Sequence, residues 1–583
     1  MATTVTLHVD DYGTWIADHE ANGGNDPATV TATLTGMERR PLISIVMALD
    51  GTTEKRVSAT IKSIIHQIYP NWELWIVSNV PGDAGLLLAP AFAGLDLRIR
   101  CERPPVASPE LAVNLVLAKV TGESVIFLDE DVLLPVDALY RVAQVIVDHG
   151  DARFVYADED RIDAQGKRFA PHFKPDWNPD LFLSWDYTGA LKVFNTALLR
   201  AIGGLKPGYG AARLYDVALR ATERLGVGGI YHIQRILYHV QDVNAESGQA
   251  KVQSAQILED AKLAVNDYLQ RQAIHANVSE SPELRGCLRV RYALPPSPPQ
   301  VTLVIPTRNG LELLRRCLES IEAKTDYPNY DIIVVDNGSD EPALLTYLES
   351  LRCSGKLEVL RDDGPFNFSR LNNGAVSVAR GSIIGLLNND LEVINADWLS
   401  EMASQALRPG IGAVGAMLWY PDNTVQHAGV VMAGGMAGHV HKGLARGEKG
   451  YFGRAALVQN FGAVTAACLV VRKDIYEAVG GLDEDFAVAF NDIDFCLRLT
   501  AGGYRNLWTP YAQLYHHESA SRGYEDTPEK IARFTREIEH LRQRWGNNLF
   551  HDPAYNPNLD PETKDFSLAR TRAGLRTGRD SRP

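Results

Sequence analysis

The sequence predicts an α/β protein made of two tandem domains, each built on a mostly parallel sheet. Short β-branched runs alternate with helical stretches, and the order strand–helix–strand is typical of right-handed βαβ units. The same order occurs twice along the 583 residues, and a proline-rich stretch separates the two copies. The composition fits this class, because 45% hydrophobic and 22% charged residues are close to the globular average.

Each copy opens with an apolar strand, a helix and a second apolar strand. In the first copy the strands are expected at residues 41–47 and 73–77, and in the second at 300–306 and 331–335. A Tyr-Pro-Asn motif followed by an aromatic residue ends the intervening helix in both copies. Short, almost continuous apolar runs of this kind indicate strands buried on both faces, as in a parallel sheet.

Later motifs recur in the same order in both copies. Asn114 precedes Asp129 by 15 residues, and Asn373 precedes Asn388 by 15 residues. A Gly-Gly-Leu motif, an Asp-x-x-x-Arg motif and a Leu-Tyr-His motif then follow in each copy. Repetition in a fixed order indicates duplication of one domain. The paired motifs are 203–205 with 480–482, 216–220 with 494–498, and 237–239 with 514–516.

These patterns predict five segments: an N-terminal extension (1–40), a first domain (41–280), a linker (281–300), a second domain (301–550) and a C-terminal tail (551–583). The linker is assigned from its proline cluster, since proline stiffens the chain and lacks the N–H that a sheet needs. The end of the tail, from residue 567, carries five arginines. We expect a solvated end there, and contact with an anionic membrane surface is the alternative.

Composition excludes several classes of function. The formal net charge of −14 argues against sequence-independent nucleic-acid binding, which needs a basic surface. No apolar run approaches the roughly 18–20 residues that span a bilayer. The N-terminus has no secretory signal pattern. The six scattered cysteines predict free thiols in a reducing compartment. We therefore expect a cytoplasmic protein with at most peripheral membrane contact.

Carboxylates follow one predicted strand of each copy. Asp390 and Asn388 come directly after the strand at 382–387, and Asp129 and Asp131 occupy the same place in the first copy. Ligands bind beyond the carboxyl ends of strands in open α/β sheets, and oxygen ligands suit Mg²⁺ or Mn²⁺. A solvated turn is the alternative for either motif alone, but its occurrence in both copies favours a metal site.

Three other positions suggest binding or catalysis. Asp336 ends a strand before Asn-Gly-Ser and is placed to bind a nucleoside, although Asn-Gly is also a plain turn signal. Asp492 and Asp494 lie in a predicted first helical turn, where a carboxylate can act as a general base or simply cap the helix. His516 follows a later strand and can bind a metal or a diphosphate, or be structural.

The second copy resembles family 2 glycosyltransferases, the inverting nucleotide-sugar enzymes of the Rossmann-like GT-A fold. The resemblance extends over residues 41–274 and 299–560. It is carried by the opening strand and loop at 301–309, Val-Asp-Asn-Gly-Ser at 335–339, Leu-Asn-Asn-Asp at 387–390, the segments 464–472 and 480–485, Asn-Asp at 491–492, and His516. Residues 416–443 further resemble transferases, rhamnosyl transferases among them, that build bacterial surface polysaccharides such as O-antigen or capsule.

The resemblance implies a metal-dependent hexosyl transfer from a UDP- or dTDP-linked sugar to a glycan, which can be lipid-linked. Asp492 would be the general base, and Asp390 and His516 would hold Mg²⁺ or Mn²⁺. Residues implied on the donor side are Pro306, Thr307, Arg308, Asp336, Arg370, Asn373, Asn388 and Asn389; on the acceptor side, Asn491, Asp494 and Cys468; and in the first domain, Asp129, Asp131, Asp216 and His239.

Two departures from the family pattern bear on activity. Asn388 replaces the first aspartate of the metal motif. In the first copy, Ser78-Asn79 replaces the acidic residue that would bind the nucleoside. When Arg220 is aligned with Arg498, Leu214 takes the position of Asp492. The first domain is thus a second transferase or a degenerate copy, and the sequence leaves this open. Residues 156–160 and 173–177 also resemble segments of tandem members.

Two other functions stay open. A sugar nucleotidyltransferase would use a similar strand–loop–acid arrangement, but it would need a glycine-rich basic first loop, which residues 306–310 lack. A carbohydrate-binding or assembly protein with decayed transferase domains is the non-enzymatic alternative.

Overall fold

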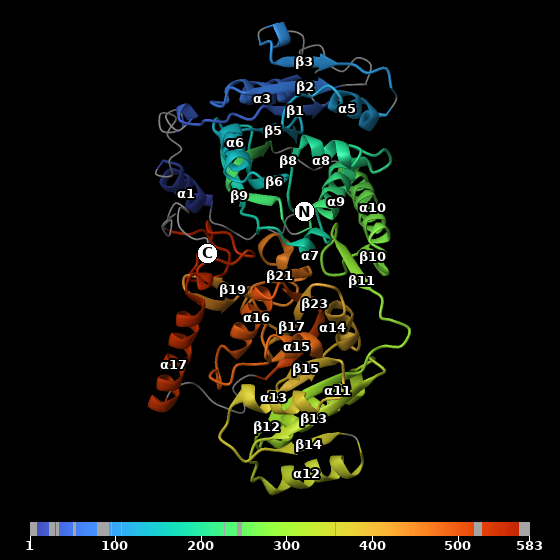
Figure 1. Ribbon diagram of the computed structural model, residues 1–583, viewed down its shortest axis with the longest axis vertical. Coiled ribbons are helices and arrows are strands. Elements are labelled where there is room, and N and C mark those ends of the chain that lie inside the picture. Colours follow the sequence, from blue (N-terminus) through green and yellow to red (C-terminus); the bar gives the residue numbers. More distant parts are fainter. Residues whose placement is uncertain are drawn as a thin grey trace.

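A computed structural model describes residues 9–21, 30, 34–49, 54–77, 92–94, 96–106, 108–226, 228–241, 248–355, 357–517 and 527–570. These residues form two α/β domains that follow one another along the long axis of the molecule (Figure 1). The predicted fold class, two tandem α/β domains, is confirmed.

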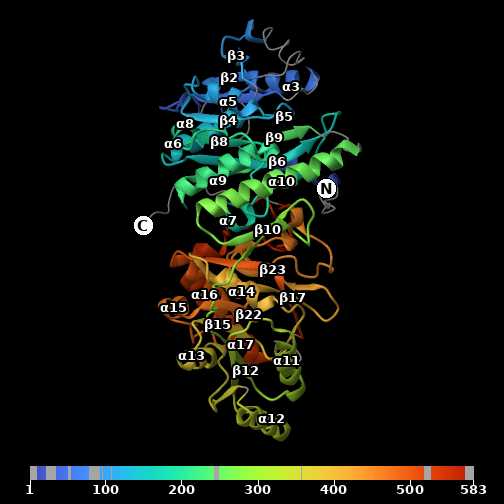
Figure 2. The ribbon, with the colours of Figure 1, turned by 90° about the vertical axis from the view of Figure 1, so that its right-hand side faces the viewer.

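The first domain is built on a nine-stranded sheet of the described residues, in the order β3-β2-β1-β4-β8-β6-β9-β5, with β7 paired to β6. Its strands are β1 (Ile43–Ala48), β2 (Trp72–Val77), β3 (Ile99–Glu102), β4 (Ser124–Phe127), β5 (Val132–Leu133), β6 (Phe154–Ile162), β7 (Arg168–His172), β8 (Lys192–Asn195) and β9 (Ile230–Gln241). Its helices are α1 (Val9–Ala21), α3 (Glu54–Ile65), α5 (Pro109–Leu117), α6 (Ala138–Asp148), α7 (Pro179–Phe182), α8 (Thr196–Ala201), α9 (Arg213–Leu225) and α10 (Gly248–Arg271). Figure 2 shows α9 and α10 side by side.

The second domain has a ten-stranded sheet within the described residues, in the order β14-β13-β12-β15-β22-β17-β23-β16, with β18 on β17 and β21 on β23. Its strands are β12 (Val301–Thr307), β13 (Tyr330–Asp336), β14 (Glu358–Arg361), β15 (Ile383–Leu387), β16 (Leu391–Val393), β17 (Ile411–Trp419), β18 (Val425–His427), β21 (Gln459–Phe461), β22 (Cys468–Arg472) and β23 (Arg505–His516), and β19 (Val430–Ala433) pairs with β20 (Met436–His439) outside it. Its helices are α11 (Leu311–Lys324), α12 (Pro342–Cys353), α13 (Phe368–Val378), α14 (Trp398–Ala406), α15 (Lys473–Ala478), α16 (Asn491–Ala501) and α17 (Pro528–Trp545).

The two sheets have the same strand order, position by position. In both sheets the opening strand lies parallel between two others: β1 lies between β2 and β4, and β12 lies between β13 and β15. The remaining strands are mixed in direction. Apolar side chains fill both faces of each sheet, which agrees with the continuous apolar runs of the sequence.

One side-chain clamp is repeated in both domains. The Asn114 amide donates to the Leu205 carbonyl at 2.7 Å, and Leu205 N–H donates back to the Asn114 amide oxygen at 2.9 Å. Asn373 makes the same pair of bonds with Leu482, at 2.8 and 3.0 Å. The clamp ties a helix to the Gly-Gly-Leu loop, so the paired motifs of the sequence occupy equivalent places in the two domains.

The predicted linker is partly a hairpin. Strand β11 (Leu288–Tyr292) lies within residues 281–300 and pairs antiparallel with β10 (Ala276–Glu280). Pro282 lies between the two strands and the proline cluster begins at Pro295, so the residues of both strands keep the N–H groups that a hairpin needs. The proline cluster therefore limits only the last third of the segment.

The predicted tail is largely packed. Leu559 and Phe566 are buried, and Asn556 donates to Asp158 Oδ2 of the first domain at 3.0 Å. Asp176 N–H also donates to the Pro553 carbonyl at 2.7 Å. Residues 551–570 thus join the two domains, whereas the rest of the arginine-rich end, 571–583, lies outside the described residues.

A buried histidine belongs to this junction. The His232 ring lies between two carboxylates, with Nε2 at 2.8 Å from Asp158 Oδ1 and Nδ1 at 2.9 Å from Asp176 Oδ1. Burial alone would lower the pKa of His232, but the two carboxylates raise it to about 9. The residues at 156–160 and 173–177 therefore build the contact between the domains.

None of the helices in the described part of the chain is both long and apolar enough to cross a membrane.

Candidate active site

Polar side chains gather at the carboxyl ends of three neighbouring strands of the second sheet. Thr307 at the end of β12 lies opposite Asp336 at the end of β13. Asn389, which follows β15, donates to the Thr307 hydroxyl at 2.9 Å. All three side chains are nearly buried. The parallel register therefore brings together residues that are far apart in the sequence, at the edge where α/β proteins bind ligands.

Asp336 is held by two partners. Its Oδ1 accepts from Ser339 N–H at 3.1 Å, and its Oδ2 pairs with Arg361 at 2.5 Å. The sequence analysis did not name Arg361, which lies at the end of β14, the edge strand. Arg361 is exposed and pairs also with Asp363, so Asp336 is paired with a positively charged side chain.

The other donor-side residues differ in their surroundings. Arg308 is exposed, beside the buried Pro306. Arg370 forms an ion pair with Asp362 and donates to the Pro365 carbonyl at 2.7 Å. It therefore braces the loop before α13, close to Asp336, and can reach a phosphate only by leaving that pair.

The Asn373 side chain is fully engaged. Besides its clamp on Leu482, its amide oxygen accepts from the Tyr476 hydroxyl at 2.6 Å. The same clamp in the first domain shows that this arrangement belongs to the fold. A donor-binding role for Asn373 stays a prediction.

Asp390 and His516 lie next to each other. Asp390 Oδ1 is 3.1 Å from His516 Nε2, and both side chains are nearly buried. The contact arises because β16 pairs antiparallel with β23, with Leu391 opposite His516. Asn388 is the third member, and its Nδ2 lies 3.2 Å from the same His516 nitrogen. The residues expected from the sequence to hold a metal are thus adjacent.

His516 has a further partner that the sequence analysis did not single out. Its Nδ1 is 2.7 Å from Gln426 Oε1 on β18. Gln426 is 90 residues away in the chain, and only the resemblance of residues 416–443 to polysaccharide transferases pointed to this segment.

The residues present fit a divalent cation. A carboxylate, an imidazole nitrogen and an amide are ligands that Mg²⁺ and Mn²⁺ accept. The Gln426 amide oxygen accepts a proton from Nδ1 of His516. Nε2 is therefore the ring nitrogen that faces the Asp390 carboxylate, at 3.1 Å, and these two atoms would be the ligands of a cation there.

Asp492 lies in the first turn of α16. Its Oδ2 accepts from Ala466 N–H at 3.1 Å, and the Thr465 hydroxyl also bonds to the carboxylate. Burial raises the pKa of Asp492, and these hydrogen bonds oppose the shift only in part. The residue as a whole is still partly exposed. Such a carboxylate is suited to accept a proton.

A two-residue stretch of backbone, Ala466–Ala467, links Asp492 to the metal motif. Ala466 N–H bonds to Asp492, and the carbonyl of the next residue, Ala467, accepts from Asn388 N–H at 2.9 Å. The three side chains Asp390, Asp492 and His516 therefore lie in one region of the second domain. The sequence analysis named the segment 464–472 but not these contacts of Thr465 and the two alanines, because two of the three contacts use backbone atoms.

The acceptor-side residues have mainly structural contacts. Asn491 bonds to the Val488 carbonyl at 3.0 Å. Asp494 is fully buried and pairs with Arg498 at 2.8 Å and Arg544 at 3.0 Å. The Cys468 thiol packs in the core, 4.0 Å from the sulfur of Met402, and burial raises its pKa. Direct acceptor contacts by these side chains stay predictions.

The first domain has an incomplete counterpart of this site. Asp129 is exposed and Asp131 partly exposed after β4. His239 Nδ1 lies 2.5 Å from Asp160 Oδ1. His239 is opposite Leu133, two residues after Asp131, whereas His516 is opposite the residue directly after Asp390. The histidine is thus shifted relative to the acidic motif.

No carboxylate occupies the base position of the first domain within its described residues. Asp216 is fully buried and pairs with Arg220 at 2.5 Å. Arg220 also bonds to the Ile202 carbonyl, as Arg498 bonds to that of Val479. Asp216 therefore corresponds to Asp494 and not to Asp492. The substituted nucleoside position, Ser78-Asn79, lies outside the described residues.

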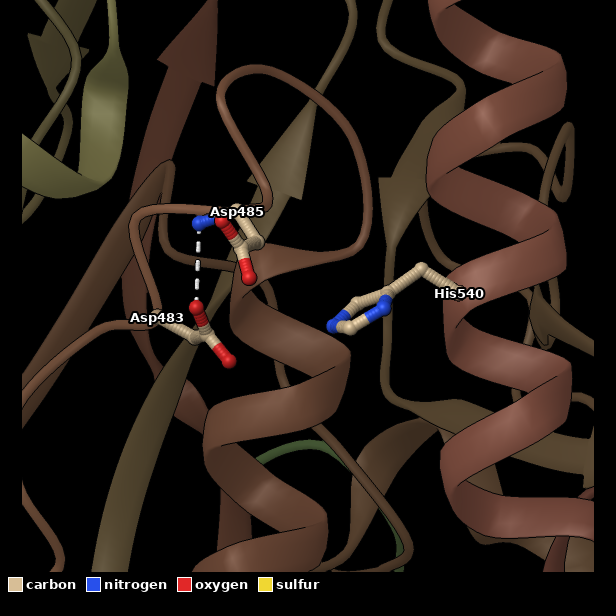
Figure 3. Close-up of side chains that lie close together, drawn as sticks. All are labelled: Asp483, Asp485 and His540. Carbon is tan, nitrogen blue, oxygen red and sulfur yellow. Dashed lines mark hydrogen bonds between the residues drawn. The ribbon is translucent and has the colours of Figure 1, made fainter.

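A second group of potential metal ligands lies between a loop and α17. Ligand atoms of Asp483, Asp485 and His540 are within 4.8 Å of one another, and Figure 3 shows the three side chains pointing toward a common centre. Asp483 also pairs with Arg544 at 2.5 Å. That guanidinium already neutralises the Asp483 carboxylate, so a cation would have to compete with it.

Known proteins resemble both domains. The model of glycosyl transferase family 2 matches residues 44–203 and 302–479, more than half of the chain. O-antigen biosynthesis protein RfbC of Myxococcus xanthus is 36% identical over 96% of this chain and 43% of its own length. The uncharacterized protein y4gI of Sinorhizobium fredii is 44% identical over 92% of this chain and 59% of its own length. The chain thus spans only about half of these relatives.

Solved structures give weaker similarities. GalNAc-T7 with UDP, GalNAc and Mn²⁺ matches 42% of this chain and 48% of that chain at 14% identity and a TM-score of 0.36. S. aureus TarS with UDP-GlcNAc matches 40% and 72% at 16% identity and a TM-score of 0.30. The assignment rests on the family model, which matches each of the two domains in turn: the chain belongs to glycosyl transferase family 2, in tandem.

Proposed function

We propose that the second domain transfers a sugar from a nucleoside diphosphate donor to a hydroxyl of a glycan acceptor, with inversion at the anomeric carbon. The observation that carries the proposal is the backbone stretch Ala466–Ala467, which bonds to Asp492 through one residue and to Asn388, next to the Asp390–His516 pair, through the other. The general base for the acceptor hydroxyl and the cation site for the donor diphosphate would then lie side by side.

Different residues of the second domain would bind the donor and take the proton from the acceptor. Asp336 and the Thr307–Arg308 loop would hold the nucleoside at the strand ends, and Arg370 would add a phosphate contact after leaving its pair with Asp362. Asp492 would take the proton from the acceptor hydroxyl as that oxygen attacks the anomeric carbon, which breaks its bond to the diphosphate. General bases of this kind contribute about 10²–10⁴-fold in rate.

Asp390 and His516, with Asn388, would hold Mg²⁺ or Mn²⁺. The bound cation would offset the negative charge that develops on the leaving diphosphate. Mn²⁺ in the GalNAc-T7 and Pyrobaculum calidifontis mannosyltransferase structures agrees with this choice.

The acceptor is proposed to be a growing surface polysaccharide. The name of the RfbC relative refers to O-antigen biosynthesis. A Mycobacterium tuberculosis relative, 34% identical over 62 residues, is named for rhamnosyl transfer to a diphospho-decaprenol acceptor, which supports a lipid-linked glycan at the inner membrane face. For the first domain, the shifted histidine and the missing base favour a scaffold or acceptor-binding role over a second transferase.

Product release from a panel of UDP-, dTDP- and GDP-sugars with Mn²⁺ tests the proposal on the full chain. Release of nucleoside diphosphate that depends on Asp390 and Asp492 is expected. Pyrophosphate from a sugar phosphate and a nucleoside triphosphate would instead identify a nucleotidyltransferase. Glycan binding without any donor turnover would indicate a carbohydrate-binding protein and overturn the proposal.

A further inference from the structure

Strand β18 meets His516 at a bulge. Leu418 of β17 is opposite His427, but the next residue, Trp419, is opposite Val425. Gln426 is therefore the extra residue of the bulge. Bulges re-aim side chains and are frequent next to active sites. Here the Gln426 amide oxygen reaches Nδ1 of His516 at 2.7 Å.

The contacts of His516 place a proton on its Nδ1. The Gln426 amide oxygen can only accept, so Nδ1 of His516 donates. In the form of the ring that can bind a cation, Nε2 carries the lone pair, and the Asn388 amide nitrogen, 3.2 Å away, can donate to it. Both neighbours favour the same tautomer, in which the lone pair of Nε2 faces Asp390 at 3.1 Å.

We propose that Gln426 is a positioning residue that holds a proton on Nδ1 of His516, so that Nε2 is the ring nitrogen that binds a cation beside Asp390, in place of the Asn388 N–H. The inference rests on the proposed function. Without this acceptor, the proton can move to Nε2 and bond directly to the Asp390 carboxylate. A cation would then have to displace that proton before it could bind.

The burial of the site supports this role. Gln426 is 6% exposed and His516 is 7% exposed, so water has little access to replace the lost acceptor. In the first domain, Nδ1 of His239 likewise faces an oxygen acceptor, Asp160 Oδ1 at 2.5 Å. Partners of this kind typically change metal affinity by about 10–100-fold.

The test is a titration of the full chain with Mn²⁺ alone, followed by the electron paramagnetic resonance signal of free Mn²⁺. All proteins carry Asp129→Ala and Asp131→Ala, which removes the acidic motif of the first domain. Gln426→Met keeps the side-chain length but lacks an acceptor, whereas Gln426→Glu keeps one. Asp390→Ala removes the proposed carboxylate ligand and shows how weak Mn²⁺ binding becomes when the site is lost.

We expect Gln426→Met to weaken Mn²⁺ binding about 10–100-fold, and Gln426→Glu to keep or tighten it, with unchanged thermal unfolding of the metal-free proteins. Equal binding by Gln426→Met and its parent, with loss in Asp390→Ala, would overturn the inference alone. Equal weakening in both Gln426 variants with lowered unfolding temperatures would show a merely structural residue. Unchanged binding in Asp390→Ala would overturn the proposed metal site as well.

Discussion

At the scale of single residues, Asp492 combines burial with access. Its carboxylate is held by Ala466 and Thr465, and the residue as a whole is still partly exposed. We expect Asp492→Asn to lower turnover about 10²–10⁴-fold with little change in donor affinity, because the amide cannot accept the proton. Turnover and nucleotide binding measure the two effects, with Asp485→Asn, an exposed aspartate of the preceding loop, as the control. Near-normal turnover would remove Asp492 from the mechanism.

The same residue predicts a pH dependence. Burial raises the pKa of Asp492, and a base works only when it is deprotonated. The acid limb of the kcat/KM profile should therefore lie above the roughly 3.9 of an ordinary aspartate, with activity falling as the pH drops through the raised value. A profile that stays flat down to about pH 4 would contradict the assignment.

At the scale of elements, the duplicated ion pairs fix the helices that follow the Gly-Gly-Leu loops. Asp494 and Arg498 on α16 match Asp216 and Arg220 on α9. Both aspartates are fully buried. Because loss of one partner leaves a buried charge, we expect Asp494→Ala to lower the free energy of unfolding by about 3–5 kcal/mol.

Thermal and urea unfolding measure this loss. The matched control is Asp474→Ala, since Asp474 pairs with Arg472 at the surface, with 64% of its side chain exposed. Exposed pairs contribute only about 0–1 kcal/mol. Equal losses in the two variants would mean that Asp494 does not carry a buried charge.

The sequence predicted the elements better than their contacts. The βαβ order follows from apolar periodicity and repeated motifs, whereas the pairing of Asp390 with His516 was expected from the resemblance to family 2 glycosyltransferases. The roles of Ala466 and Ala467 could not be predicted, because they act through backbone atoms. The contact of Gln426 with His516 could not be predicted for another reason. A β-bulge orients the Gln426 side chain, and a bulge leaves no periodic pattern in the sequence.

At the scale of the whole molecule, the junction between the domains was the least predictable part. Residues 551–583 were assigned to a C-terminal tail, with a solvated end expected from residue 567 because of its arginines. The partners of Asn556 lie about 400 residues earlier, at Asp158 and Lys174. Hydrogen bonds over such separations cannot be inferred from local pattern.

The junction also predicts how stability depends on pH. The pKa of His232 is raised to about 9 by Asp158 and Asp176, so its charged form stabilises the folded state. This stability is fully present below the unfolded value of about 6.5 and is lost as the pH rises through about 9. The shift corresponds to about 3 kcal/mol.

Thermal unfolding between pH 6 and pH 10 checks this expectation. The unfolding temperature of the wild type should fall over the range, and His232→Gln should flatten the curve. His149→Gln, at an exposed ring, is the control and should leave the slope unchanged. A slope unaffected by His232→Gln would contradict the charged state of this ring.

The twin Asn–Leu clamps give the molecule an internal standard. A change made at Asn373 can be repeated at Asn114 in the same polypeptide, under one buffer and one level of expression. A loss of unfolding free energy that is equal in the two variants reflects the fold that both domains share. Any further loss of activity that occurs only in the Asn373 variant measures a role specific to the second domain.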